Sequence, residues 1–342
     1  MLEKRITHTV PLMSPWDRSS TVLDKRSPFD ALASDYDRSF TYSAIGRAQR
    51  HAVWKVAQRV FVPGTRILEL NCGTGVDAVY LARLGLKVTA LDSSSQMIAV
   101  AQDRVQRERC QNSIRLMHWA IEELDRLPPE APYDGAFSNF GGLNCVLDLQ
   151  RFGCDLARRL KPGSPVLLCL MGRYCLWELF YHPLKGQFPK AVRRLKKDGV
   201  LATPGNDQEA KPESLPPDAP SGTQGDIYSP KALPPASVRR ARSGVMGRRW
   251  NTRELNSRHV PPEQTIRVVY PSVRSLVRGL QPHFRYRHHL AVGLFVPPSY
   301  LEHWASRHPR FLNVMDQIDN RVGRWPLLRN AGDHYLIHLE RL

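Results

Sequence analysis

The sequence predicts an α/β protein built on a doubly wound parallel sheet. The prediction depends on residues 66–92, which read RILELNCGTGVDAVYLARLGLKVTALD. A short apolar run leads into a glycine-rich turn, a segment with helical spacing of apolar residues, and a second apolar run that ends in Asp92. This order of strand, turn, helix and strand is the βαβ unit that opens nucleotide-type folds. Because parallel strands need a crossover that covers the sheet, both strands are expected to be interior.

The turn of this unit is compatible with two classes of cofactor. Residues 73–78 fit the G-x-G-x-x-A pattern of dinucleotide-binding turns, and Asp92 follows about 20 residues later, where that pattern places an acid for the ribose. Glu69 distinguishes the two classes. A carboxylate beside the turn repels a pyrophosphate by roughly 4 kcal/mol at ~4 Å, but it attracts the sulfonium and ammonium groups of S-adenosyl-L-methionine (SAM). The sequence therefore favours SAM over NAD.

Two motifs carry a resemblance to a known family. Residues 69–75, ELNCGTG, resemble the E-x-G-x-G-x-G motif of class I SAM-dependent methyltransferases. Asn71 replaces the first glycine, and asparagine is one of the few residues that adopt left-handed backbone angles at modest cost. Residues 29–37, FDALASDYD, resemble the F-D-x-x-A-x-x-Y-D lead-in of the ubiquinone/menaquinone-biosynthesis-like group, also called type 11. The resemblance is close over residues 28–172 and loose over 264–342.

The resemblance implies a Rossmann-like methyltransferase fold with a doubly wound, seven-stranded, mostly parallel sheet whose last strand is antiparallel. Ligands of such open sheets lie outside the carboxyl ends of the strands. The residues expected to contact SAM are Tyr36, Glu69, Asn71, Cys72, Gly73, Thr74, Gly75, Asp92, Ser93, Met97, Ala120, Ile121, Asn139 and Phe140. For Tyr36 and Met97, a position in the apolar core is the alternative.

Periodicity and turn residues place the remaining elements. Helices are predicted over residues 28–60, 76–86, 93–106, 147–160, 190–197, 272–280, 299–307 and 311–322, with Ser299 as a helix cap. Strands are predicted over residues 114–120, 133–140, 166–171, 264–270, 289–296 and 334–339. The strand over residues 264–270 is expected to belong to the lid, and the two strands over 289–296 and 334–339 are expected to complete the sheet of the first unit.

Composition divides the chain into five parts. They are a loose N-terminal arm (1–27), a SAM-binding core with N-terminal cap helices (28–172), lid helices (173–201), a disordered Pro/Arg-rich insertion (202–262), and the rest of the sheet with acceptor-site helices (263–342). The lid is predicted because an apolar, aromatic stretch is followed there by a basic one. A helix packed on its own core is the alternative for that part.

Charge is distributed unevenly along the chain. The net charge is +17, of which residues 1–150 carry +1 and residues 151–342 carry +16. The basic half indicates an anionic partner, such as a membrane surface, a nucleic acid or an acidic substrate, with simple solubility as the alternative. Residues 139–142, NFGG, differ from the N-P-P-[FY] motif of nucleic-acid amino methylases, which makes a nucleic acid the less favoured partner.

Cysteine spacing and hydropathy exclude several classes of protein. The six cysteines show no C-x-x-C or metal-ligand spacing, so neither a disulfide framework nor a metal site is expected. No apolar run approaches the ~18 residues of a transmembrane helix, and residues 1–13 lack the apolar core of a signal peptide. We therefore expect a cytoplasmic protein with reduced thiols.

Together these patterns predict an enzyme that moves a methyl group from SAM to a small, lipophilic or aromatic acceptor, at oxygen or carbon, by in-line displacement. The donor is already activated, so the protein mainly supplies alignment. Candidate general bases are His118, His182, His288 and His289, which the sequence does not rank, so no catalytic residue is assigned. An RNA methyltransferase remains open because of the basic half. A SAM-binding module without turnover also remains open because of Asn71 and Trp119, the latter standing where many relatives have an adenine-binding Asp.

Overall fold

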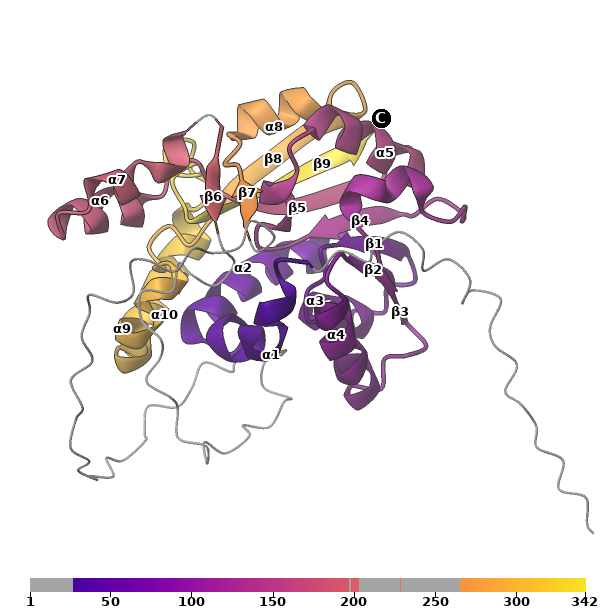
Figure 1. Ribbon diagram of the computed structural model, residues 1–342, viewed down its shortest axis with the longest axis horizontal. Coiled ribbons are helices and arrows are strands. Elements are labelled where there is room, and N and C mark those ends of the chain that lie inside the picture. The colour runs from indigo at the N-terminus through magenta and orange to yellow at the C-terminus, as the bar shows by residue number, and fades with distance from the viewer. Residues whose placement is uncertain (1–26, 197, 203–227, 229–264) are drawn as a thin grey trace, which may run out of the picture.

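A computed structural model describes residues 27–196, 198–202, 228 and 265–342. Within these residues, seven strands form one sheet in the order β3-β2-β1-β4-β5-β9-β8 (Figure 1). Their bounds are β1 Arg66–Leu70, β2 Lys87–Asp92, β3 Ile114–His118, β4 Gly135–Ser138, β5 Pro165–Met171, β8 Phe284–Val292 and β9 His334–Arg341. Strands β1 to β5 are parallel, and β9 runs antiparallel between β5 and β8. The predicted seven-stranded, mostly parallel sheet with an antiparallel last strand is confirmed.

Helices cover both faces of this sheet (Figure 1). One face packs against α2 (Ala44–Val60), α3 (Val76–Arg83) and α4 (Ser95–Arg107). The other packs against α5 (Leu149–Arg159) and α8 (Val273–Leu280). The sheet is therefore buried between two apolar cores, as a parallel sheet requires.

Strand β1 shows how the sequence meets both cores. Successive side chains of a strand point to opposite faces. Ile67 accordingly packs in the core of α2 and α3, whereas Leu68 and Leu70 pack in the core of α5 and α8. Glu69 is the one charged residue inside this strand, and only 2 % of its surface is exposed. Its position on the Ile67 face determines what it does in the candidate site.

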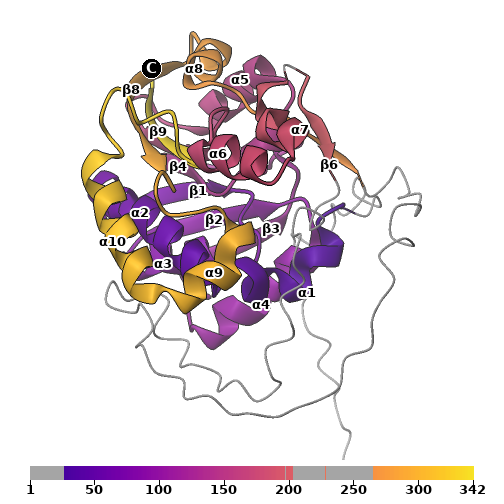
Figure 2. The same cartoon turned by 90° about the vertical axis from the view of Figure 1, so that its left-hand side faces the viewer.

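Short elements surround the ends of the sheet. A 3-10 turn (Asp30–Leu32), α1 (Ala33–Tyr36) and a π-helical turn (Asp37–Thr41) precede α2. The other short elements are 3-10 turns at Ile121–Arg126, Gly142–Cys145, Arg193–Leu195 and Ser299–Leu301, helices α6 (Leu176–Leu184), α7 (Phe188–Ala191), α9 (Glu302–Arg307) and α10 (Pro309–Val322), and the strand pair β6 (Val200–Ala202) and β7 (Ile266–Val268). Figure 2 shows α9 and α10 beside α2, on the same side of the sheet.

The predicted basic helix over residues 190–197 is wrong. Helix α7 ends at Ala191, and residues 193–195 form a separate 3-10 turn. Arg193 and Arg194 of this turn both pair with the buried Glu178 of α6, at 2.9 and 2.7 Å from its Oε1. These ion pairs connect the turn to α6.

The predicted strand over residues 289–296 has the wrong bounds, since β8 begins at Phe284 and ends at Val292. Its first half alternates apolar and basic residues, and the exposed Arg287 pairs with Glu340 of β9. After Val292 the chain leaves the sheet, because the N–H groups of residues 294–296 donate to the Asp319 carboxylate of α10 and not to a neighbouring strand. Ser299 begins a 3-10 turn and does not cap a helix.

Two sequence predictions fall outside the described residues. They are the loose arm over residues 1–27, of which Ser27 is described, and the disordered insertion over residues 202–262, of which Ala202 and Tyr228 are described. Among the helices of the described ranges, none combines the length and the apolar character needed to cross a bilayer.

Candidate functional site

A cavity of about 280 Å³ lies at the carboxyl ends of β1, β2 and β4, and we call it the strand-end cavity. Phe29, Leu32 and Tyr36 of the segment before α2 line one part of it. The β6–β7 pair and the residues that follow it line another. The remaining wall consists of Asn71, Gly73, Asp92, Ser93, Met97, Ile121, Glu122, Asn139, Phe140, Gly141, Gly142, Cys145 and Met171. The cavity is thus where an open α/β sheet places its ligand.

The turn after β1 approaches this cavity with its backbone in left-handed conformations. Asn71 has φ of 57°, Gly73 53° and Gly75 78°. The prediction that asparagine adopts the left-handed angle here is confirmed. A Cβ atom on Gly75 would lie 2.9 Å from the Cβ of Ala101 in α4, so glycine at this position allows α3 and α4 to pack closely.

Asp92 connects the turn to the end of β2. Its Oδ2 accepts a hydrogen bond of 2.8 Å from the Gly73 N–H, and its Oδ1 accepts one of 2.9 Å from the Ser94 N–H. Burial raises the pKa of the Asp92 carboxyl, while the two backbone hydrogen bonds oppose that rise. Each carboxylate oxygen can accept a further hydrogen bond. Asp92 therefore both shapes the turn and offers acceptors to a ligand.

Glu69 does not line the strand-end cavity. It lies within the sheet, and its Oε2 is buried without a hydrogen-bond partner among the described residues. Burial, followed by the nearby Asp77, raises the pKa of the Glu69 carboxyl well above its usual range. Its position therefore does not support the charge argument that the sequence attached to Glu69. Among the described residues, the cavity wall contains the carboxylates of Asp92 and Glu122 and no Lys, Arg or His.

A buried polar cluster supports the cavity from behind. The Asp77 carboxylate accepts hydrogen bonds from Arg50, from Trp54 Nε1 at 2.6 Å, and from Asn139 Nδ2 at 3.2 Å. The Arg50 guanidinium also lies 4.7 Å from the centre of the Phe140 ring. Asp77 and Arg50 neutralise each other inside the fold, and together they fix Asn139 and Phe140 at the cavity wall.

The structure brings together nine of the fourteen predicted contact residues. Those on the cavity wall are Tyr36, Asn71, Gly73, Asp92, Ser93, Met97, Ile121, Asn139 and Phe140. Those that do not line it are Glu69, Cys72, Thr74, Gly75 and Ala120. Thr74, for example, donates its hydroxyl proton to Asp37 Oδ1 at 2.7 Å and so anchors the π-helical turn. Contact of any of these residues with SAM remains a prediction.

Sequence reasoning missed one side of the cavity. Glu122 lies in the 3-10 turn after β3, and Tyr270 follows β7, far along the chain from the glycine turn. No local pattern marks either residue. Phe29 and Leu32 belong to the lead-in motif over residues 29–37, so that motif could have predicted their position at the cavity. Trp119 supports packing, because its Nε1 donates to the Glu123 carbonyl at 2.9 Å and the ring packs on the core.

None of the four histidines considered as general bases lines the strand-end cavity. His118 Nε2 bonds the Ser93 carbonyl at 3.0 Å, and His182 Nδ1 bonds the Gln187 amide at 3.1 Å. His288 and His289 lie on β8, at the other edge of the sheet. Within the described residues, no three His, Cys, Asp or Glu side chains are placed to hold a metal ion.

Part of this chain is similar to known proteins. Residues 67–163 match the family described as methyltransferase domain. A demethylmenaquinone methyltransferase of Tropheryma whipplei (strain Twist) is 31% identical over 147 residues, which are 42% of this chain and 57% of that protein. A malonyl-[acyl-carrier protein] O-methyltransferase of Bacillus cereus is 30% identical over 167 residues, 47% of this chain and 56% of that protein.

Among solved structures, an S-adenosylmethionine dependent methyltransferase from Mesorhizobium loti aligns with 85% of this chain and 98% of its own at 16% identity, with a TM-score of 0.45. The chain spans little more than half the length of the two curated relatives. The matched segment contains β1 to α5 and the glycine turn. The resemblance to class I SAM-dependent methyltransferases is confirmed, and SAM is the cofactor of this domain type.

Proposed function

We propose that this protein transfers the methyl group of SAM to a small, lipophilic or aromatic acceptor, at oxygen or carbon. The observation that carries the proposal is the charge of the strand-end cavity, whose described lining residues include Asp92 and Glu122 and no cationic side chain. A sulfonium and an ammonium are attracted to such a wall. A pyrophosphate would face two carboxylates without a compensating cation, and each close pair of like charges costs roughly 4 kcal/mol at 4 Å.

The proposed placement of SAM follows from the chemistry of the wall. Asp92 accepts hydrogen bonds from the ribose hydroxyls. Met97 and Ile121, both buried, provide apolar surface for the adenine. Tyr36 and Phe140 present aromatic rings near the turn, and an aromatic ring attracts a cation such as the sulfonium. These residues would align the donor, and alignment is the main contribution that an activated donor requires.

The acceptor is proposed to occupy the side formed by Met171, Ile266, Val268 and Tyr270. This side is mostly apolar, which suits a lipophilic or aromatic molecule. No described histidine or lysine lines the cavity, and burial raises the pKa of Tyr36 to about 12, so this phenol is a poor base at neutral pH. An acceptor acidic enough to ionise by itself fits the site. The named demethylmenaquinone methyltransferase supports a quinone-related acceptor.

Calorimetry of the full chain with SAM and, separately, with NAD tests the cofactor part. We expect SAM to bind and NAD not to bind, and the reverse result would contradict the proposal. Mass spectrometry of reactions with host metabolites then tests turnover. Formation of S-adenosylhomocysteine with a methylated small molecule supports the proposal. Methylation of RNA alone would favour the RNA alternative, and SAM binding without any product would favour a non-catalytic module.

A further inference from the structure

A second cavity, of about 440 Å³, shares no lining residue with the strand-end cavity and lies between α8, the β8–β9 part of the sheet and the segment after β5. Three arginines line it: Arg173 after β5, Arg274 of α8, and Arg329 in the segment before β9. No Asp or Glu is found among the described residues of its wall. We call it the arginine cavity. All three arginines belong to the half of the chain that carries +16 of the net charge.

No carboxylate of the described residues compensates the charge of the arginine cavity. Within the described residues, the Arg274 and Arg329 side chains form no hydrogen bond or ion pair, and the Nε atoms of Arg329 and Arg173 are buried without a partner. Arg173 donates one hydrogen bond, from NH2 to the Leu195 carbonyl at 3.0 Å. Three like charges around one space repel each other, and an anion between them would remove that repulsion.

Helix α8 adds to this positive field. Arg274 is the second residue of α8, and the helix has no acidic residue in its first turn. The first turn of a helix carries partial positive charge, so a cation is disfavoured there and an anion is favoured. Ser272, Val273 and Arg274, at the start of this helix, all line the cavity, and Ser272 Oγ caps the helix by accepting from the Ser275 N–H at 3.1 Å. The N-terminus of α8 and the three arginines therefore both favour an anionic ligand.

Polar and aromatic side chains that are held by hydrogen bonds form part of the cavity wall, which we call its floor. Tyr286 Oη lies 2.8 Å from His289 Nδ1, and His289 Nε2 lies 3.0 Å from Asn330 Oδ1. Because the Asn330 oxygen accepts, the neutral His289 carries its proton on Nε2 and Tyr286 donates to Nδ1. Tyr335 is fixed by its hydroxyl, which donates to the Pro271 carbonyl at 3.0 Å. The floor thus offers flat aromatic surface in a fixed arrangement.

We propose that the arginine cavity binds a small phosphate-bearing molecule with a flat or apolar part, at a site separate from the SAM site. Arginine is suited to phosphate because its planar guanidinium donates two parallel hydrogen bonds to phosphate oxygens. The tyrosines and Val277 provide surface for the rest of the molecule. A volume of about 440 Å³ accommodates a ligand of nucleotide size.

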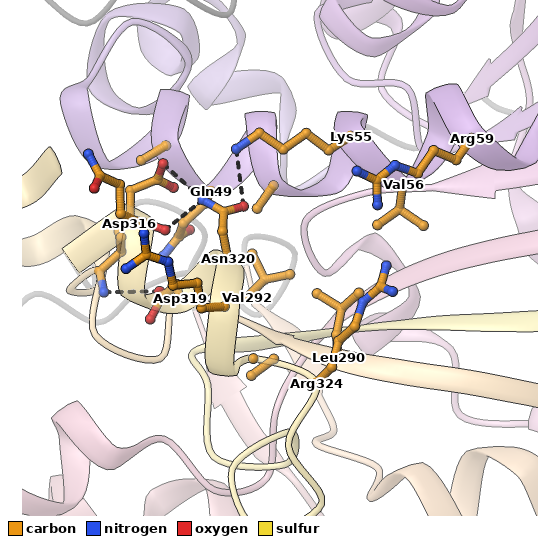
Figure 3. A pocket seen from close by; sticks show the side chains of 18 residues that line it. Gln49, Lys55, Val56, Arg59, Leu290, Val292, Asp316, Asp319, Asn320 and Arg324 are labelled. Carbon is orange, nitrogen blue, oxygen red and sulfur yellow. Dashed lines mark hydrogen bonds between the residues drawn. The ribbon is translucent and has the colours of Figure 1, made fainter. Parts of the chain in front are cut away.

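A third hollow supplies the control. The cleft between α2, β8 and α10 has a volume of about 620 Å³ and also carries basic side chains, among them Arg59 and Arg324 (Figure 3). Here Asp316 and Asp319 line the same wall, and the Lys55 ammonium donates to Asn320 Oδ1 at 3.1 Å. Its basic groups are thus partly compensated, and removing Arg59 and Arg324 changes the net charge of the protein by the same amount as removing Arg274 and Arg329.

The test is calorimetry on the full chain saturated with SAM, titrated with pyrophosphate and with AMP. We expect one molar equivalent of AMP to bind. The double variant R274Q/R329Q should weaken that binding by about tenfold or more, since each lost charged hydrogen bond is worth about tenfold. R59Q/R324Q should leave it unchanged, and R274K/R329K should restore part of it. Unchanged melting temperature and SAM affinity would show that the variants fold.

Three results would overturn the proposal. The first is equal weakening by R274Q/R329Q and R59Q/R324Q, which would indicate attraction by net charge alone. The second is competition between AMP and SAM, which would place the anion in the strand-end cavity. The third is the absence of binding by either probe at millimolar concentration. Binding of RNA or anionic vesicles by the same protein that fails to bind AMP would assign the basic half to a macromolecule.

Discussion

The strand-end cavity and the arginine cavity lie on one sheet but have opposite charge. In the part of the chain that the structure describes, the first is lined by Asp92 and Glu122 without a cation, and the second by three arginines without a carboxylate. A net charge of +17 for the whole chain predicts neither arrangement. The difference teaches that a net charge describes the chain, whereas ligand choice depends on which side chains the fold places around one space.

The two cavities also differ in origin. The strand-end cavity lies where parallel strands β1, β2 and β4 end, a position that the doubly wound topology provides in any sequence of this fold. The arginine cavity lies over the antiparallel pair β8 and β9, and it depends on where α8 and the segment after β5 pack. The first is therefore a property of the fold class, and the second is a property of this chain.

The largest expected effect tests whether the strand-end cavity binds SAM. Asp92→Ala should weaken SAM binding by about 1.5–3 kcal/mol, or roughly 10- to 150-fold, because a charged hydrogen-bond acceptor is lost. Calorimetry measures this change. Arg274→Gln serves as the matched control and should leave SAM affinity within a factor of about two. A smaller loss in Asp92→Ala than in Arg274→Gln would show that the negative wall is not the SAM site.

The pH dependence should have opposite signs in the two cavities. Burial raises the pKa of the Asp92 carboxyl above its usual value. As the pH falls toward this raised pKa, the carboxylate becomes protonated and SAM binding weakens. Burial and then Arg329 lower the pKa of His289, so its ring gains charge only below its ordinary pKa of about 6.5. Tyr286, Asn330, Arg329 and His288 surround this ring.

Sulfate stays dianionic across this range and is the probe for the second cavity. Its binding should be constant from pH 8 to 6.5 and should strengthen below about 6.5, as His289 becomes a cation beside the arginines. Titrations at several pH values measure both ligands. His289→Gln should remove the acid strengthening of sulfate binding and leave the SAM profile unchanged. Parallel pH profiles for the two ligands would contradict the assignment of opposite charge.

Salt should separate the cavities by a smaller amount. Exposed charges are screened at ionic strengths near 0.1 M, where the Debye length is about 10 Å, and buried groups are screened less. Arg274 is exposed, whereas Asp92 is buried. Raising the NaCl concentration should therefore weaken AMP binding several-fold and change SAM binding little. Equal salt dependence in the two titrations would count against the difference in burial.

The last effect is on stability and concerns the turn that shapes the strand-end cavity. Asn71 has a left-handed φ of 57°. Asn71→Ala should destabilise the fold by about 1–2 kcal/mol, because alanine lacks the short polar side chain that lets asparagine adopt this conformation at modest cost, whereas Asn71→Gly should be nearly neutral. Chemical denaturation measures both changes. Asn71→Leu is not a suitable control because it also fills the cavity. An equal loss in the Gly and Ala variants would mean that the Asn71 side chain, not its backbone angle, is what the turn requires.

Much of the first cavity could be predicted from the sequence. The order of β1, α3 and β2 follows from apolar spacing, and the glycine turn and Asp92 follow from residues adjacent in the chain. These features are local, since strand and helix periods fix which residues end each element. The sequence also predicted the left-handed Asn71, because few residue types adopt that angle.

Only the tertiary structure decided which charges meet a ligand. Glu69 of β1 is buried in the covered interior, whereas Glu122 and Tyr270 line the cavity although they belong to segments distant in the sequence. The arginine cavity likewise brings together Arg173, Arg274 and Arg329, which lie far apart in the sequence. Local periodicity fixes the face on which a side chain lies, but long-range packing fixes its neighbours, and electrostatic selection of a ligand depends on neighbours.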